Sequence, residues 1–382
     1  MSPRPAWMNE EHERFGDSVR RFFAETMVPK RDEWRKNGIV DRDFWHQAGE
    51  LGVLAASTPE DYGGAGGSQA FDAVTLYEQA RCGDTSWGFS VHNITAHYIL
   101  SYGTEEQKLE WLPKLASGEV IAGIAMTEPG TGSDLQQVQT MAVADGQDYL
   151  VSGAKTFISN GQIADLTLLV AKTDKNAAAK GVSLLLVDTR ELEGFRRGRN
   201  LEKLGNKGQD TSELFFDQAR IPQRQLLGGE PGQGFVQLMR QLPWERLMIG
   251  IIAVGASDFA LDETLKYVRE RKAFGQRIMD FQNTRFKLAE AKTKVEVTRA
   301  FINDCMVKLE AGTLDAATGS MAKWWGAQVQ NEIADECLQL HGGYGFMDEY
   351  PISQIYADAR VQKIYGGTNE IMKELIARSL DQ

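Results

Sequence analysis

The spacing of hydrophobic residues divides the chain into three regions. From Glu10 to Gly118 the apolar residues recur every three or four positions, which is the period of an α-helix with one buried face. Gly38, Gly49, Gly103 and the glycine-rich stretch 61–67 interrupt this pattern and predict helix ends. We therefore expect an N-terminal region built of several helices.

The middle of the chain has a different pattern. Leu166–Val170, Val182–Val187 and Glu213–Phe216 are short runs of leucine, β-branched or aromatic residues, each bounded by Gly, Asp, Asn or Lys. Such runs are typical of β-strands. The segment Asp174–Lys180 is expected to be an exposed loop.

Helical spacing returns after Gly234. Six apolar residues fall three, four or seven positions apart, as on one face of a long helix: Leu288, Ala291, Val295, Ile302, Cys305 and Leu309. Gly312 is expected to end this helix, and Pro243 suits the first position of an earlier helix. The order helical, β, helical predicts an α+β fold with domains at 1–119, 120–232 and 233–382.

The overall charge restricts the classes of partner. The 382 residues include 42 Lys and Arg against 53 Asp and Glu, so the formal net charge is −11. This acidity argues against an extended phosphate-binding surface and therefore against nucleic acid as the main partner, whereas a local basic pocket is compatible with it.

Cysteine usage and apolar runs indicate the compartment. Cys82, Cys305 and Cys337 form no CxxC pair, which indicates neither a disulfide framework nor a zinc site. The longest charge-free apolar run, about Leu247 to Ser257, is shorter than the roughly 20 residues of a membrane span. The segment Met1–Trp7 leads directly into charged residues, so we expect no targeting peptide and a cytoplasmic location.

Most common catalytic motifs are missing from the sequence. It contains no P-loop, no HExxH and no GxSxG, and its five histidines lack metal-ligand spacing, so no metal is expected. The strings Gly130–Gly132 and Gly232–Gly234 lack the third glycine of a Rossmann nucleotide site. Hydrolytic, metal-dependent and Rossmann-type chemistry are therefore disfavoured.

Five polar, glycine-rich strings remain as candidate ligand loops. In Ala125–Asp134, hydroxyls and exposed amides suit an anionic or heteroaromatic ligand, and in Lys155–Gly161 an aromatic beside a hydroxyl suits a flat ring. Glu270–Gly275 and Gln339–Phe346 combine an arginine with close glycines, as in phosphate sites, and Ile364–Ile371 is similar. Each string taken alone also fits an ordinary turn or helix end.

In this order and at this spacing, the five strings resemble the acyl-CoA dehydrogenase family over essentially the whole chain. Gly208–Phe216 and Tyr365–Leu375 are most similar to its long-chain members, although a chain-length preference does not follow. The resemblance implies an N-terminal helical domain, a central β domain and a C-terminal four-helix bundle. It also implies a homotetramer that uses FAD to convert an acyl-CoA into trans-2-enoyl-CoA in fatty acid β-oxidation, with electrons passed to an electron-transferring flavoprotein.

The resemblance also assigns cofactor-binding positions. FAD is expected between the β domain and the C-terminal domain, with a neighbouring subunit completing its site. Near the flavin ring the resemblance implies Met126, Thr127, Phe157 and Ser159. It places Thr368 and Glu370 near the ribityl phosphate, and Ser133 near the pyrophosphate or the CoA. Residues implied for the adenosine diphosphate half, in part across the subunit boundary, are Arg271, Phe274, Gln282, Gln339, Gly342 and Gly343.

The chain departs from the common family pattern at the catalytic base. Many members carry a glutamate directly after the tyrosine of the last string, where this chain has Gly366 after Tyr365. Other members supply the base from an earlier helix in a Glu-Arg pair, and Glu245 and Arg246 stand at the corresponding place. We therefore expect Glu245 to be the base. The alternative is an acid in the first turn of a helix that begins at Pro243, where the helix dipole favours it.

The resemblance further implies how the site works. Burial would raise the pKa of Glu245, which takes the α-proton while the β-hydride passes to the flavin, and the N–H of Gly366 would bind the thioester oxygen. Arg246 is expected to orient Glu245 or to contact the CoA, with a surface cation as the alternative. Ser133 and Tyr365 complete the expected substrate contacts.

Two other functional interpretations stay open. A flavin-dependent monooxygenase or oxidase uses a similar scaffold, and the chain could also bind FAD or CoA without catalysis.

Overall fold

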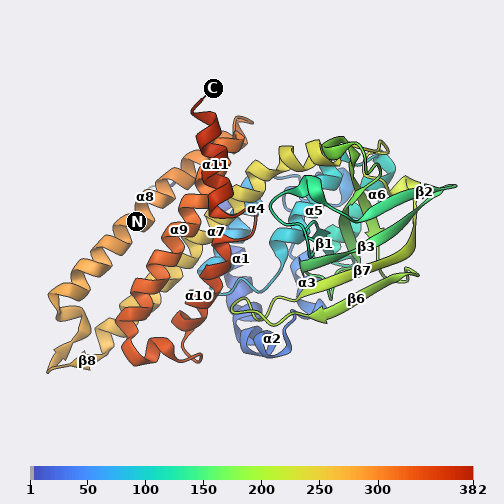
Figure 1. Ribbon diagram of the computed structural model, residues 1–382. Helices are drawn as coiled ribbons and strands as arrows, with labels where there is room; N and C mark the ends of the chain where they lie inside the picture. The colour runs from blue at the N-terminus through green and yellow to red at the C-terminus, as the bar shows by residue number, and fades with distance from the viewer. Residues whose placement is uncertain (1–3, 382) are drawn as a thin grey trace.

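A computed structural model describes residues 4–381 and shows the helical, β, helical order (Figure 1). Residues 1–3 of the segment in which we expected no targeting peptide lie outside the described residues. The N-terminal helices are α1 (Glu10–Phe22), α2 (Arg31–Asn37), α3 (Arg42–Glu50), α4 (Gln69–Arg81), α5 (Phe89–Tyr102) and α6 (Glu105–Ser117). Thr104 caps α6 by accepting the N–H of Gln107, and Gly118 ends it with φ 75°. Gly49, expected at a helix end, is the residue before the last one of α3.

The central region forms one mixed sheet. Its strands are β1 (Ala122–Ala125), β2 (Met141–Asp145), β3 (Asp148–Ser159), β4 (Leu166–Lys172), β5 (Val182–Asp188), β6 (Phe195–Asn200) and β7 (Thr211–Pro222). Their order is β1-β4-β2-β3-β7-β6, with β5 paired to β4. The three predicted strand runs are confirmed as β4, β5 and part of β7, and β4 and β5 are buried along almost their whole length.

The C-terminal region consists of long packed helices. They are α7 (Gly234–Glu270), α8 (Gln282–Glu310), α9 (Ala316–His341), α10 (Pro351–Ala359) and α11 (Asn369–Ser379), with a small hairpin of β8 (Lys272–Ala273) and β9 (Gln276–Arg277) between α7 and α8. The predicted α8 stripe and its end near Gly312 are confirmed. The prediction that a helix begins at Pro243 is wrong, because α7 begins at Gly234 and contains Pro243.

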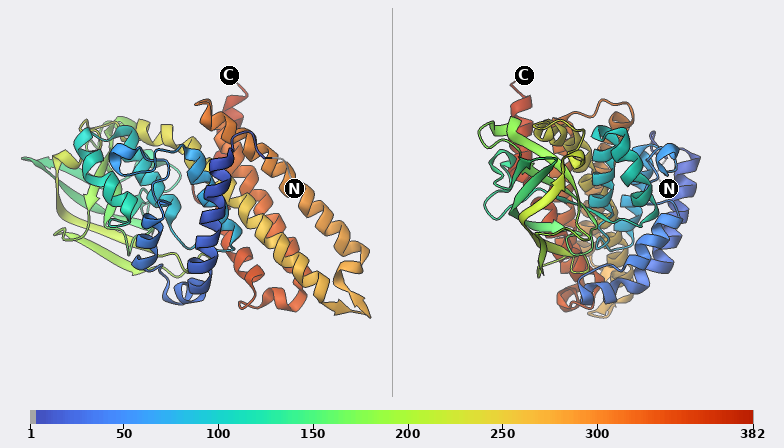
Figure 2. Two further views of the ribbon diagram at one scale, coloured as in Figure 1. Left: turned by 180° about the vertical axis from the view of Figure 1, so that it is seen from behind. Right: turned by 90° about the vertical axis from the view of Figure 1, so that its right-hand side faces the viewer.

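The sheet occupies one end of the molecule and the long C-terminal helices occupy the other, while the N-terminal helices pack along one side of both (Figures 1 and 2). In the part of the chain that the structure describes, no helix is both long and apolar enough to cross a membrane.

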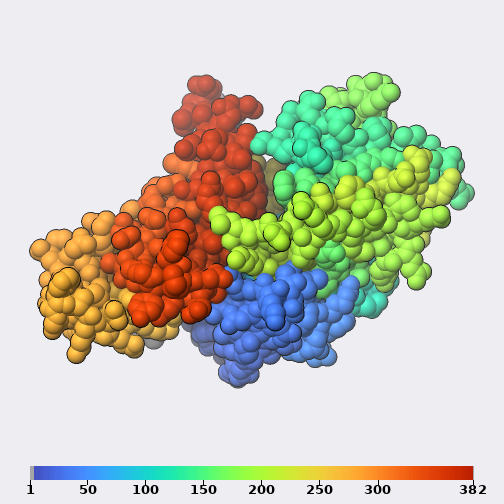
Figure 3. Space-filling view, turned by 60° about the horizontal axis from the view of Figure 1, so that its bottom comes forward, coloured from blue at the N-terminus to red at the C-terminus, as the bar shows by residue number. Residues whose placement is uncertain are grey.

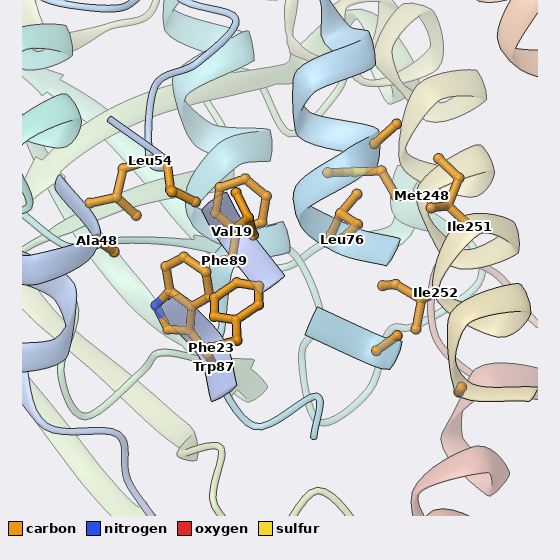
Figure 4. Packing of buried hydrophobic residues seen from close by; sticks show 14 of the residues in the cluster. Val19, Phe23, Ala48, Leu54, Leu76, Trp87, Phe89, Met248, Ile251 and Ile252 are labelled. Atoms are coloured by element: carbon orange, nitrogen blue, oxygen red, sulfur yellow. The ribbon is translucent and has the colours of Figure 1, made fainter. Parts of the chain in front are cut away.

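A shared hydrophobic core joins the N-terminal helices to α7. Met248, Ile251 and Ile252 of α7 face Leu76 of α4, and Trp87 lies with further aromatic residues in the same cluster (Figure 4). Burial of each such side chain stabilises the fold by about 1.5–3 kcal/mol. Since Glu245 precedes these residues on α7, the core fixes the position of the candidate base.

Candidate active site

A cavity of about 570 Å³ lies where the N-terminal helices, the β-sheet and the C-terminal helices meet. Figure 3 shows the surface hollowed between α11 and the β region. The cavity brings together nine residues predicted from the sequence: Met126, Thr127, Ser133, Phe157, Ser159, Glu245, Arg246, Tyr365 and Gly366. These residues come from three of the strings and from α7, so the fold brings together residues that are far apart in the sequence.

A buried ion pair fixes the loop after β1. The Lys155 ammonium is fully buried and donates to Glu128 Oε1 at 2.8 Å and to the Met126 carbonyl at 3.1 Å. The Thr127 carbonyl accepts the N–H of Thr156 at 2.9 Å. The backbone of Met126 and Thr127 is therefore held against β3 from both sides. Although Lys155 and Glu128 lie inside two of the strings, no local pattern in the sequence indicates that they pair.

A bulge in β3 directs Phe157 outward. The pairing of β3 with β7 shifts between Lys155 and Ile158, and Phe157 has φ 60°, which is uncommon for a residue with a side chain. Its ring lines the cavity and is 68% exposed. A strained bulge that presents a bare aromatic face indicates a site for a flat ligand.

Glu245 lies in the wall of the cavity and is only 8% exposed. The Tyr98 hydroxyl donates to Glu245 Oε1 at 2.9 Å. Burial raises the pKa of Glu245 to about 7, while the Tyr98 hydrogen bond and the charge of Arg246 act in the opposite direction. Because α7 begins at Gly234, Glu245 is not in a first helical turn, and the helix-dipole alternative no longer applies. Nothing in the sequence distinguished Tyr98 from a core residue.

Arg246 is buried beside Glu245 rather than exposed on the helix surface. It is 6% exposed, its Nη1 lies 3.2 Å from Ser320 Oγ, and its Nε has no hydrogen-bond partner within the described residues. The surface-cation alternative is therefore wrong. Lys323 of α9 is buried as well, and it donates to Asn369 Oδ1 at 3.1 Å.

Gly366 lines the cavity at the end of a turn before α11. Its φ is 65°, and its N–H donates no hydrogen bond within residues 4–381. Thr368 caps α11 by accepting the N–H of Ile371, and Glu370 lies in the first turn of that helix. The neighbouring residues Gly367 and Ile371 line the cavity, whereas Thr368 and Glu370 do not.

A second cavity of about 530 Å³ lies at the far end of the long helices. It is lined by four predicted residues, Arg271, Gln339, Gly342 and Gly343. Phe274 is at the tip of the β8–β9 hairpin, has φ 52° and is 96% exposed, and Gln282 is the first residue of α8. Phe274 and Gln282 line neither cavity, so the single chain does not bring all the predicted adenosine-binding residues together.

Comparison with known proteins places this geometry in a family. The sequence models of the acyl-CoA dehydrogenase N-terminal, middle and C-terminal domains match residues 9–119, 123–219 and 232–380. The long-chain specific acyl-CoA dehydrogenase of Rattus norvegicus mitochondria is 49% identical over 97% of this chain and 87% of its own length. The chain therefore belongs to the acyl-CoA dehydrogenase family, and it is an oxidoreductase.

Solved structures agree with this assignment. An acyl-CoA dehydrogenase from Geobacillus kaustophilus has a TM-score of 0.96 and 45% identity, covering 99% of this chain and 100% of that chain. A chain from a structural study of the electron transferring flavoprotein of Acidaminococcus fermentans has a TM-score of 0.93 and 32% identity, covering 98% of both chains. A Mycobacterium smegmatis glutaryl-CoA dehydrogenase in complex with FADH2 has a TM-score of 0.91 and 28% identity, covering 98% and 95%.

The residues of the larger cavity fit the flavin that this family uses. The exposed Phe157 ring offers a flat face, and the hydroxyls of Thr127 and Ser159 line the same cavity. A Cβ added at Gly130 or Gly132 would meet no atom within 4 Å, so the backbone of this loop is open to a ligand. The donor set therefore suits a polar heteroaromatic ring.

Proposed function

We propose that the chain catalyses the FAD-dependent α,β-desaturation of an acyl-CoA thioester, with Glu245 as the base. The observation that carries the proposal is the buried Glu245, whose pKa is raised to about 7 and which shares one cavity with Gly366 and the Phe157 ring. A base with this pKa is half ionised near neutral pH, which suits proton abstraction. The dehydrogenase names of the relatives favour this reaction over the oxygen-dependent alternative.

In the proposed mechanism Glu245 removes the α-proton of the thioester and holds it. The N–H of Gly366, which makes no other hydrogen bond within the described residues, donates to the thioester oxygen and stabilises the negative charge that develops there. The flavin, when bound, supplies the oxidant that takes up the β-hydride. Arg246 balances the charge of the buried carboxylate. The products are a trans-2-enoyl thioester and a protonated Glu245.

Anaerobic bleaching of the flavin tests the assignment of the base. Glu245→Gln is expected to retain flavin and to bind acyl-CoA, because the amide is nearly isosteric, but the bound flavin stays oxidised. Glu263→Gln is the matched control, since this carboxylate lies on the same helix and pairs with Lys266 at the surface. It is expected to bleach like the unsubstituted protein.

Two results of this experiment would contradict the proposal. Normal bleaching of the Glu245→Gln protein would exclude Glu245 as the base. A flavin-loaded, unsubstituted protein that no acyl-CoA reduces, across a panel of chain lengths and branching patterns, would exclude desaturation altogether.

The lining of the cavity supports a long acyl chain as substrate. Phe235, Met239, Leu242 and Glu245 of α7 line it at spacings of three or four residues, so they form one stripe along the helix. From Phe235 to Glu245 this stripe is about 15 Å long. The relatives with 49% identity are named long-chain specific, which agrees with such a groove.

The separation of the two cavities supports an assembly in which residues of one copy help to bind the FAD of another copy. Glu245 lies on the continuous α7 and Arg271 directly follows its last residue, so the two are about 39 Å apart, which is longer than one extended FAD molecule. The adenosine-binding residues Arg271, Phe274 and Gln282 therefore serve the FAD of another copy, in a homotetramer. Arg271→Ala is expected to lose flavin although its own larger cavity is intact, and retained flavin would contradict this arrangement.

Electrons are proposed to leave to an electron-transferring flavoprotein. The likeness to the Acidaminococcus fermentans structure supports this partner. Transfer to a purified electron-transferring flavoprotein, followed as its flavin reduction, is the test. The cytoplasmic location stays a prediction, since the relatives named above include mitochondrial enzymes.

A further inference from the structure

Helix α5 is attached firmly to the β-sheet and to α6. Buried His92 accepts the N–H of Ala122 at Nδ1 and donates from Nε2 to the Leu115 carbonyl, both at 3.1 Å. The Thr95 hydroxyl lies 3.3 Å from the Gly123 carbonyl. Because these contacts from His92 and Thr95 hold one turn of α5 against β1 and α6, a side chain on the inner face of the next turn has a fixed position relative to β1.

Tyr98 extends from this anchored helix to α7. Its side chain is 0% exposed, and its hydroxyl donates to Glu245 Oε1 at 2.9 Å. Among residues 4–381 this is the only hydrogen bond that the Glu245 carboxylate accepts, and Glu245 lines the cavity. One oxygen is therefore held and the other is unpaired beside the cavity.

Within residues 4–381, Tyr98 is the only residue whose side chain makes a hydrogen bond with the Glu245 carboxylate. The titratable groups on the elements around it are Arg246 of α7, Tyr102 and the His97–Asp72 pair behind Trp244, Lys323 of α9, Tyr365 before α11, Glu374 and Arg378 of α11, and Asp134 of the loop after β1. Of these, Arg246 acts on the carboxylate through its charge without a hydrogen bond between them. Removal of the Tyr98 hydroxyl would therefore leave the carboxylate without a donor.

We propose that Tyr98 is a positioning residue for the reaction, holding one oxygen of Glu245 so that the other faces the α-carbon of the substrate. This inference rests on the proposed function, in which Glu245 is the base. A hydroxyl that donates to a carboxylate favours the ionised form, so Tyr98 both orients the base and increases its ionised fraction at neutral pH. The contact joins α5 to α7, and thereby ties the base to the wall that carries the flavin-contacting loop.

Tyr98→Phe, studied as the flavin-loaded protein, tests the inference. The acidic limb of kcat/KM is expected to move to higher pH by about one to two units, as for loss of a charge-assisted hydrogen bond. Flavin reduction near neutral pH is expected to slow by about 10–100-fold, with substrate KM changed far less. Tyr102→Phe is the matched control, because this tyrosine lies one turn further along α5, with ring centroids 6.1 Å apart, and does not line the cavity.

The outcomes separate this inference from the proposed function. If Tyr98→Phe leaves the acidic limb in place while Glu245→Gln abolishes bleaching, Tyr98 is not a positioning residue and the base assignment stands. A lower melting temperature without a shift of the limb likewise means that Tyr98 only supports the fold. If Glu245→Gln bleaches normally, the proposed function itself fails.

A second variant covers the case in which Tyr98→Phe does not fold. Glu245→Asp keeps Tyr98 but withdraws the carboxylate from its hydroxyl, so the acidic limb is again expected at higher pH than in the unsubstituted protein. Aspartate has a lower ordinary pKa than glutamate, so a limb at higher pH would come from loss of the Tyr98 hydrogen bond and not from the aspartate itself. A limb at unchanged or lower pH would overturn the inference.

Discussion

Gly366 lies against Ile249 so closely that a Cβ at position 366 would come within 2.5 Å of Ile249 Cδ1. Ile249 follows Glu245 by one turn of α7, and Gly366 has φ 65°. The position that holds the base in many family members is therefore closed by the helix that carries the candidate base in this chain. A side chain at position 366 would therefore require Ile249 to shift.

A side chain at position 366 should therefore be harmful. Gly366→Ala is expected to lower the free energy of unfolding by about 1–2 kcal/mol from the positive φ alone, with a further loss from the contact with Ile249. Because Ile249→Ala has its own cost as a buried truncation, the second part is measured as the coupling in a double-mutant cycle of the two substitutions. Thermal unfolding of both variants measures this, and a single variant as stable as the unsubstituted protein would contradict it. Gly366→Glu is likewise expected not to restore bleaching to Glu245→Gln.

The raised pKa of Glu245 predicts opposite pH effects on activity and stability. Activity needs the ionised form, so kcat/KM is expected to rise with pH through about 7. The folded protein holds this proton more tightly than the unfolded chain, whose glutamate has a pKa near 4.5. Ionised Glu245 therefore destabilises the fold, by an amount that grows between these pH values to at most about 3 kcal/mol.

Glu245→Gln should consequently be more stable than the unsubstituted protein at pH 8 and almost equally stable at pH 5. Urea unfolding at the two pH values checks this. Equal stabilities at pH 8 would mean that the carboxylate is not desolvated.

The buried ion pair of Lys155 and Glu128 predicts that substitutions at the two positions have strongly non-additive effects on the free energy of unfolding. Lys155→Met leaves a buried carboxylate without its cation and is expected to lower the free energy of unfolding by about 3–5 kcal/mol. It should also weaken flavin retention, because Lys155 holds the Met126 carbonyl. Adding Glu128→Gln removes the unpaired charge and should restore part of the stability. Denaturant unfolding and flavin content are the measurements, and additive losses in the double variant would contradict the coupling.

The stripe on α7 predicts how acyl length can be altered. Met239→Trp narrows the groove beyond Glu245, so kcat/KM for long acyl-CoAs should fall by at least about tenfold while short ones change little. Val236→Trp is the control, because Val236 lies on the same helix, is exposed and does not line the cavity. Equal losses for short and long substrates would place the acyl chain elsewhere.

Local patterns in the sequence predicted the three regions and the strands β4 and β5, because those segments have continuous apolar runs or clear helical spacing. The start of α7 was missed because Pro243 favours a first helical position, whereas packing of Leu238 and its neighbours carries the helix through it. The hydrogen bond from Tyr98 to Glu245 joins residues 147 positions apart, and no local pattern reports such a contact. The bulge at Phe157 depends on register with β7 and is hidden for the same reason.

The length of α7 has a genetic consequence in the proposed assembly. In that assembly Glu245 of α7 would be the base for the chain's own substrate, and Arg271, directly after the end of α7, would bind the cofactor of a neighbour. A copy damaged at the first end still serves its neighbour, and a copy damaged at the second end still has its own base. Two individually inactive gene products, mixed in one oligomer, would therefore complement each other and regain a fraction of working sites.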